Sequence, residues 1–100
     1  MNKTYLMSPA KAWVKRKAGP DEIVRVVPDM EENGMVLCYR LYVAYGYMKD
    51  NLPDEKNPDY LGRILFDTNG YWIYDGDELS VTEQEQLAKF ICGYVEHSPL

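Results

Sequence analysis

The chain has 100 residues, of which 46% are hydrophobic and 27% are charged, and we expect it to fold as one domain over residues 1–100. This composition argues against an intrinsically disordered or fibrous protein, and no run of apolar residues approaches the roughly 18 to 20 needed to cross a bilayer. The formal net charge of −5 disfavours direct binding to nucleic acid or to anionic lipid.

The first predicted element is a short helix over residues 9–17. Ser8 is a good N-cap, Pro9 lacks an amide that would be unpaired at this position, and Gly19 supplies a left-handed cap after the last turn. A strand through Ala12 to Arg16 is the competing interpretation, because the tryptophan and valine in this stretch suit a sheet equally well.

Two strands follow and form the first predicted hairpin. Residues 22–27 are rich in β-branched side chains and end at Pro28, which cannot donate to a central ladder. After an acidic turn over residues 29–34, the stretch from Met35 to Tyr45 shows the strongest period-two pattern in the sequence. Its odd-numbered residues are predicted to face the core: Met35, Leu37, Tyr39, Leu41, Val43 and Tyr45.

A second hairpin is predicted farther along the chain. The stretch 60–66 and the sequence YWIY flank a turn over residues 67–70. A two-residue loop would place Phe66 opposite Ile73, and a four-residue loop would place it opposite Tyr71. Both registers put the same side chains on one face, namely Ile64, Phe66, Tyr71 and Ile73, and leave Leu65, Trp72 and Tyr74 on the other.

The C-terminal helix is the most clearly marked helix. Two reciprocal cap patterns, one beginning at Ser80 and one at Thr82, mark its start, and Pro99 bars its extension. Its apolar stripe consists of Leu87, Ala88, Phe90, Ile91, Tyr94 and Val95. We therefore predict an α+β fold, in which a four-stranded antiparallel sheet of two hairpins has a short N-terminal helix and a C-terminal helix packed on one face.

The least ordinary feature of the composition is its nine tyrosines and two tryptophans. Aromatic side chains supply large contact areas with a polar tip and are enriched at protein interfaces. A patch of four aromatic residues on the sheet is predicted to bind a partner: Tyr42, Tyr47, Trp72 and Tyr74. The alternative is burial of these side chains beneath the N-terminal helix through Trp13. The long loop over residues 46–59 is a second candidate for partner binding, with a mobile connection that binds nothing as its alternative.

No pattern in the sequence points to a catalytic, cofactor-binding or metal-ligating residue. Residues 67–78 have the length of a calcium-binding loop, but Tyr71 and Trp72 stand where a ligand and an obligatory glycine are required. The single histidine, His97, lies past a helix end and is predicted to cap it rather than to activate a cysteine.

Three functional hypotheses follow from these observations. The leading one is a non-enzymatic protein-interaction domain, such as an adaptor, an inhibitor or a self-associating module. The second is an acidic mimic of nucleic acid, because the residues after position 25 hold fourteen acidic and five basic side chains. The third is an enzyme or small-ligand binder with a pocket between the sheet and the C-terminal helix, built from Tyr39, Arg40 and Arg63.

The expected partner is another protein or a second copy of the chain, with no membrane and no direct nucleic-acid partner. We expect a cytoplasmic protein, because the first residues lack the apolar region of a secretory signal. No cofactor is expected.

Overall fold

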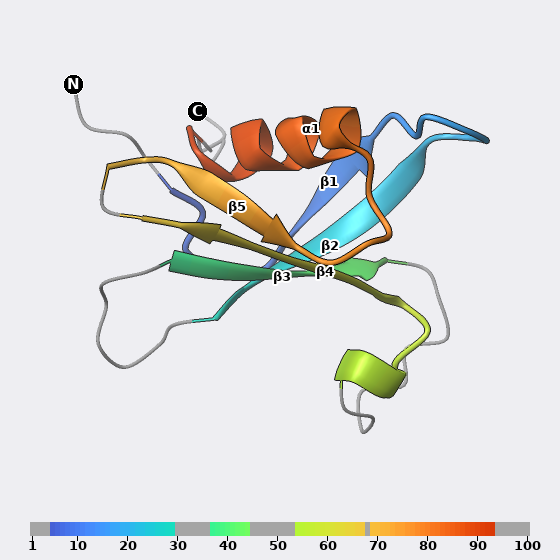
Figure 1. Cartoon of the computed structure of the whole chain (residues 1–100), viewed down its shortest axis with the longest axis horizontal. Helices are drawn as coiled ribbons and strands as arrows, with labels where there is room; N and C mark the ends of the chain where they lie inside the picture. Colours follow the sequence, from blue (N-terminus) through green and yellow to red (C-terminus); the bar gives the residue numbers. More distant parts are fainter. Residues whose placement is uncertain (1–4, 30–36, 45–53, 68, 94–100) are drawn as a thin grey trace, which may run out of the picture.

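The computed structural model describes residues 5–29, 37–44, 54–67 and 69–93 of the chain. The described residues form five strands, a single 3₁₀ turn and one α-helix (Figure 1). In chain order these are β1 (Ala10–Val14), β2 (Glu22–Asp29), β3 (Leu37–Val43), the 3₁₀ turn η1 (Asp54–Lys56), β4 (Tyr60–Phe66), β5 (Trp72–Asp75) and α1 (Val81–Ile91). Each strand pairs antiparallel with the next, so the sheet order is β1-β2-β3-β4-β5 and the two edges are β1 and β5.

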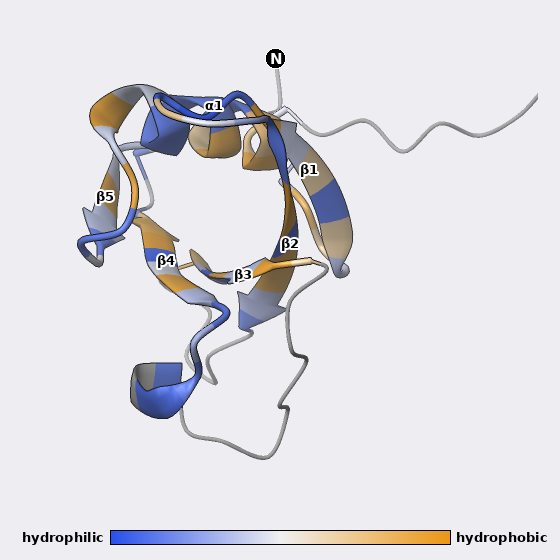
Figure 2. Ribbon diagram, turned by 90° about the vertical axis from the view of Figure 1, so that its right-hand side faces the viewer, coloured by the Kyte–Doolittle hydropathy of each residue, from blue (hydrophilic) through white to orange (hydrophobic). Residues whose placement is uncertain are grey.

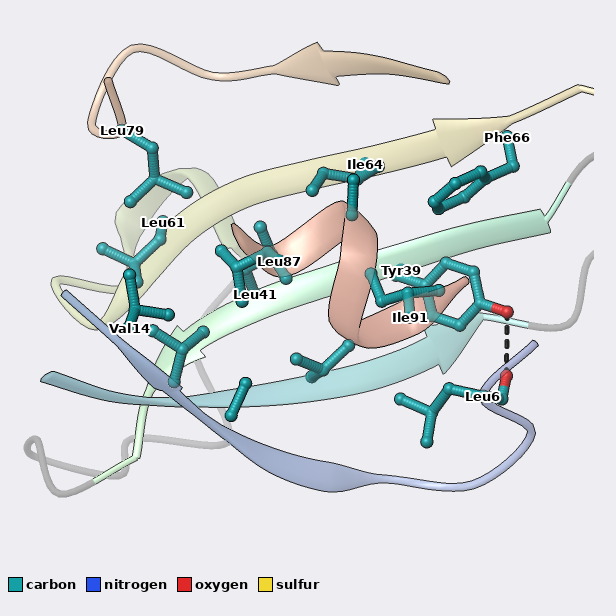
Figure 3. Packing of buried hydrophobic residues seen from close by; sticks show 14 residues of the cluster. Leu6, Val14, Tyr39, Leu41, Leu61, Ile64, Phe66, Leu79, Leu87 and Ile91 are labelled. Carbon is teal, nitrogen blue, oxygen red and sulfur yellow. Dashed lines mark hydrogen bonds between the residues drawn. The ribbon is translucent and has the colours of Figure 1, made fainter. Parts of the chain in front are cut away.

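The sheet curls around its own core, and α1 lies across the opening between the two edge strands (Figure 2). Apolar side chains from all of β1 to β4 and from α1 fill the interior (Figure 3). The fully buried ones include Val14, Val24, Leu41, Ile64 and Leu87. The α+β class, the antiparallel sheet and the C-terminal helix are therefore confirmed. No helix among the described residues has the length and apolar character needed to span a bilayer.

The predicted core face of the 35–45 segment is confirmed over the part of it that the structure describes. Tyr39 and Leu41 are buried in the core, and Leu37 and Val43 pack against it. Met35 and Tyr45 lie outside the described residues. The alternation holds because side chains on one strand point to opposite faces of the sheet in turn.

The predicted N-terminal helix is wrong, and residues 10–14 form strand β1 instead. This segment pairs with β2 from Ala10 opposite Val26 to Val14 opposite Glu22, which gives five strands rather than four. As a strand it buries Ala12 together with Val14 and leaves Trp13 exposed. Tertiary pairing therefore outweighs a weak local helix preference, and the competing strand interpretation was the correct one.

The predicted register of the second hairpin is also wrong. Phe66 pairs with Trp72, because the connection between β4 and β5 contains five residues. The Asp67 carboxylate closes this longer turn by accepting hydrogen bonds from the Asn69 and Tyr71 amides, both at 2.9 Å. A shift of one residue moves every side chain of a strand to the other face. Trp72 therefore shares the core face with Phe66, and Ile73 faces outward. The sequence had predicted that Ile73 shares a face with Phe66 and that Trp72 lies on the opposite one.

The start of α1 agrees with one of the two predicted cap patterns. Ser80 is the N-cap, its hydroxyl accepts from the Glu83 amide, and the Glu83 carboxylate accepts from the Ser80 amide at 2.7 Å. The helix then buries Leu87, Ala88 and Ile91 against the sheet. Of the other predicted stripe residues, Phe90 is half-buried and packs against the core, and Tyr94 and Val95 lie outside the described residues.

Tyr39 makes the stability of the folded chain depend on pH in the alkaline range. Its buried hydroxyl donates to the Leu6 carbonyl oxygen at 2.8 Å (Figure 3). Burial, with smaller contributions from Tyr5 and Cys92, raises the pKa of Tyr39 to about 12. The folded state thus holds the Tyr39 proton more tightly than the unfolded chain, whose tyrosines titrate at about pH 10. The stabilisation is complete below pH 10 and is lost as the pH rises through 12.

We therefore expect the difference in unfolding free energy between the native chain and Tyr39→Phe to shrink by about 2 kcal/mol between pH 9 and pH 12. Urea unfolding at several pH values measures this difference. The Tyr71→Phe variant is the matched control, because the Tyr71 side chain is 74% exposed. Parallel stability curves for the native chain and Tyr39→Phe would contradict the expectation.

Candidate functional site

The two edges of the sheet differ in how well they are covered. At the β1 edge, the Gln86 side chain of α1 accepts from the Lys15 amide at 2.8 Å and donates to the Lys15 carbonyl at 2.9 Å. It thereby satisfies the same two backbone groups that a further strand would satisfy. Two residues farther along the chain, the Lys17 amide donates a hydrogen bond to the Glu83 carboxylate at 2.8 Å. These bonds block a new strand at Lys15 and Lys17, just past the end of β1.

Further contacts fix α1 over this side of the molecule. Arg16 bridges Glu83 at 3.0 Å and Glu22 at 3.1 Å. At the other end of the helix, the Leu6 amide donates to the Ile91 carbonyl at 3.0 Å, and Tyr5 forms an isolated β-bridge with Cys92. The helix is anchored at both ends to the N-terminal part of the chain.

No described residue covers the β5 edge in this way. The Asp67 amide donates to the Tyr71 carbonyl at 2.8 Å, which makes these two residues a hydrogen-bonded pair. Because such pairs alternate along an antiparallel ladder, Ile73 bonds to β4, whereas the N–H and C=O groups of Trp72 and Tyr74 point away from it. Among the described residues, no backbone or side-chain group forms a hydrogen bond with these outward groups.

A groove runs along the inner side of this open edge. It has a volume of about 420 Å³ and lies between the β4–β5 turn and α1. Its lining is mainly apolar and comes from Phe66, Gly70, Trp72, Glu85, Ala88, Lys89 and Cys92. The Trp72 side chain forms its strand side, and the charged side chains of α1 stand at its rim.

A second hollow lies on the outer side of the same strand. It has a volume of about 350 Å³ and is lined by Leu65, Phe66, Asp67, Tyr71, Trp72 and Ile73. Tyr71 and Ile73 are 74% and 67% exposed, which is unusual for large apolar side chains side by side on an edge strand. The β5 edge thus has an apolar recess on each face of the sheet.

The structure separates the aromatic residues that the sequence grouped into one patch. Tyr42 lies on the outer face of β3, where its hydroxyl donates to Asp54 at 3.0 Å and its ring contacts Tyr60. Trp72 and Tyr74 pack on the core side of β5. Tyr47 lies outside the described residues. Trp13 does not cover any of these rings, because it is exposed on β1 and bonds to Asp21 at 2.9 Å.

The residues of the hypothetical small-ligand pocket are not brought together either. Tyr39 faces the core, whereas Arg40 and Arg63 lie on the outer face of the sheet. Arg40 pairs with Asp29 at 2.8 Å, and Arg63 pairs with Asp75 at 2.9 Å. Burial is the largest single effect and lowers the pKa of Arg40, but Asp29, Tyr42 and Asp54 together outweigh it, so the net shift is upward. Both guanidinium groups are therefore engaged in ion pairs.

Tyr74 connects the open edge to the rest of the fold. Its hydroxyl donates to the Leu61 carbonyl and accepts from the Glu78 amide at 3.2 Å. Burial raises the pKa of Tyr74, so the hydroxyl stays protonated at neutral pH. These bonds hold the end of β5 and the following turn in place beside β4.

Sequence reasoning selected Trp72 and Tyr74 but missed Tyr71, Ile73 and the α1 side of the groove. The missing signal was the capacity of Asp67 to accept hydrogen bonds from two amides of the turn, which lengthens the loop and turns Ile73 outward. The groove itself depends on where α1 crosses the sheet, and no local pattern specifies that.

The described residues contain no cluster of three or more histidine, cysteine or acidic side chains arranged to hold a metal ion. The 72–75 segment, which falls inside the calcium-loop spacing, is extended as the strand that the sequence predicted. Neither protein-family models, nor curated proteins, nor solved structures give a match to this chain.

Proposed function

We propose that this chain is a non-enzymatic protein-binding domain that takes up an extended segment of a partner protein along β5. The observation that carries the proposal is a contrast between the two edges: Gln86 and Glu83 occupy the backbone groups of Lys15 and Lys17 just past the end of β1, whereas no described residue bonds to the outward groups of β5. Proteins generally protect edge strands from pairing with other chains. An edge that stays open beside two apolar recesses is suited to a specific partner.

The geometry of β5 supplies both parts of this binding mode. A peptide that adds to a sheet edge gains main-chain hydrogen bonds, and its alternate side chains enter recesses on the two faces of the sheet. The outward N–H and C=O groups of Trp72 and Tyr74 provide the main-chain partners. The groove beside α1 receives one set of side chains and the hollow over Tyr71 and Ile73 receives the other.

The shortness of β5 gives the site selectivity. With four residues, the strand offers only two outward-facing residues to a partner. Each added hydrogen bond contributes about 0.5 to 1.5 kcal/mol net, so main-chain pairing alone is weak. Binding therefore depends on side chains that fill the recesses, and segments without suitable side chains are rejected.

Replacement of Ile73 by lysine is expected to reduce partner capture by the immobilised chain at least about tenfold, since a charge then occupies the outer hollow. Stability is expected to change little, because Ile73 is mostly exposed. The matched control is Trp13→Lys, which alters an equally exposed apolar residue on the opposite edge. Proteins captured equally well by the native chain and by Ile73→Lys do not bind at β5.

Hydrogen exchange locates the contact with a captured partner. We expect the Trp72 and Tyr74 amides to exchange rapidly in the free chain and at least about tenfold more slowly in the complex. The Ile73 amide, which bonds to β4, serves as an internal reference that is already protected. Unchanged exchange at Trp72 and Tyr74 in the complex would contradict strand addition.

A further inference from the structure

We infer that the segment received by β5 is basic, with apolar side chains at alternate positions and lysine or arginine around them. This inference rests on the proposed function and specifies the chemistry of its partner. It follows from the charges that surround the open edge, from the apolar lining of the two recesses, and from the like charges that oppose pairing of β5 with β5 of a second copy.

Carboxylates surround β5 at both ends. Asp67 stands before the strand, and Asp77 and Glu78 follow it, all of them exposed. Asp75 ends the strand, and Glu85 faces it from α1 at the rim of the groove. Among the residues that the structure describes, the cations near this edge are Arg63, which is already paired with Asp75, and Lys89. Five carboxylates against two cations give the edge an acidic field that attracts a basic segment.

Within this acidic frame, the recesses themselves are apolar. Ala88, Cys92 and Trp72 line the inner groove, and Leu65 and Ile73 line the outer hollow. A segment of roughly six residues, extending one residue beyond each end of β5, spans this surface at about 3.3 Å per residue. Its central side chains enter the recesses, and its terminal side chains reach the carboxylates.

Pairing of β5 with its own counterpart in a second copy is unfavourable. Pairing of β5 with β5 of another copy would place two acidic edges side by side, and like charges across an interface are unfavourable. The basic side of the molecule, around Lys11, Lys15 and Lys17, includes the end of β1 that Gln86 and Glu83 close. Head-to-tail pairing of sheet edges would therefore be limited to Ala10–Val14 of β1. The occupant that we propose is a basic segment of a different protein.

Selection of a randomised nine-residue peptide display library on the immobilised full chain tests this inference. The Ile73→Lys chain serves for counter-selection, so that only peptides bound at β5 are retained. We expect enriched peptides to alternate apolar residues with lysine or arginine. Their affinity is expected to fall about tenfold between low salt and 0.5 M salt, because salt screens the exposed carboxylates.

A charge variant of the same edge gives an independent readout. In Asp77→Asn combined with Glu78→Gln, we expect the affinity of a selected peptide to fall about three- to tenfold. The matched control is Asp21→Asn, which removes an exposed carboxylate at the β1–β2 turn and is expected to leave peptide affinity unchanged. Alkylation of Cys92 in the groove is expected to slow when the peptide is bound, with the buried Cys38 as reference.

The outcomes separate the inference from the proposed function. Enriched peptides that are neutral or acidic, or that bind independently of salt, overturn the basic chemistry of the partner and leave β5 as the binding edge. A library from which no peptide is enriched over the Ile73→Lys chain overturns both.

Discussion

Replacement of Glu83 by alanine is expected to destabilise the folded chain by about 3 kcal/mol, at the lower end of the cost of breaking a buried ion pair. Glu83 is 3% exposed and joins three parts of the molecule. Its carboxylate accepts from the Ser80 amide at the start of α1 and from the Lys17 amide, and it pairs with Arg16. Truncation leaves both amides without an acceptor. The cost stays at the lower end because Arg16 retains Glu22.

The contribution of Glu83 also depends on pH. Burial alone would raise the pKa of Glu83, but the amides of Ser80 and Lys17, the Ser80 hydroxyl and the charge of Arg16 outweigh it and lower the pKa. The folded state therefore favours the ionised form more than the unfolded chain does. The stabilisation is complete above the unfolded pKa of about 4.3 and is lost as the pH falls through the lower folded pKa.

The Glu83→Gln variant isolates this charge. It keeps the shape of the side chain and one acceptor oxygen, and we expect it to cost roughly 1 to 2 kcal/mol at pH 7. Its stability and that of the native chain are expected to converge in acid. The control is Glu85→Gln, an exposed acid in the same helix, whose effect is expected to stay within about 0.5 kcal/mol. A cost of Glu83→Gln that is the same at pH 7 and pH 3 in urea unfolding would contradict the role assigned to the charge.

Prediction from the sequence succeeded for those elements whose hydrophobic pattern extends over several residues and agrees with the residues at their ends. Leu37, Tyr39 and Leu41 occupy alternate positions, and a strand is the structure that turns all three toward one buried face. The cap at Ser80 and the apolar residues that follow it define α1 locally. In both cases local preference and burial point to the same structure, and the prediction succeeded for that reason.

The errors arose where a local signal is compatible with two structures. Gly19 was interpreted as the left-handed end of a helix, and its φ of 88° is indeed positive, but it lies in the connection between β1 and β2. Strand pairing along β2, which lies several residues away in sequence, decides between the two. In the second hairpin, the capacity of Asp67 to cap a longer turn shifted the register by one residue.

These two errors had unequal consequences for the candidate site. Identifying β1 correctly shows that β1, and not β2, is the second edge of the sheet, and that Gln86 of α1 bonds to Lys15 just past its end. The register of β5 determines which apolar side chains reach the surface, and the observed register exposes Ile73 instead of Trp72. Tyr42 was placed correctly on the even-numbered face of its strand, opposite the core, yet its hydroxyl is engaged by Asp54. The site therefore depends on register and helix placement, which are tertiary properties.

Replacement of Gly62 by alanine is expected to destabilise the chain by about 3 kcal/mol or more, through backbone strain combined with a steric clash. Gly62 has a φ of 114°, which L-residues rarely adopt. It pairs with Leu41 at the point where the β3–β4 register shifts. A Cβ atom at this position would lie 2.7 Å from the Asp75 carbonyl oxygen and 2.7 Å from the Tyr74 ring.

Gly19→Ala is the matched control, because it separates strain from clash. Gly19 also has a positive φ, but a Cβ atom there would contact nothing within 4 Å, so we expect a cost of only about 1 kcal/mol. Since Gly62 lies against Tyr74 and Asp75, its substitution is also expected to displace β5 and to weaken partner binding, whereas Gly19→Ala leaves binding intact. Urea unfolding and peptide affinity measured on both variants test this. Equal costs for the two substitutions would show that β5 does not pack against Gly62 as described, and that the open edge is not held in place by this contact.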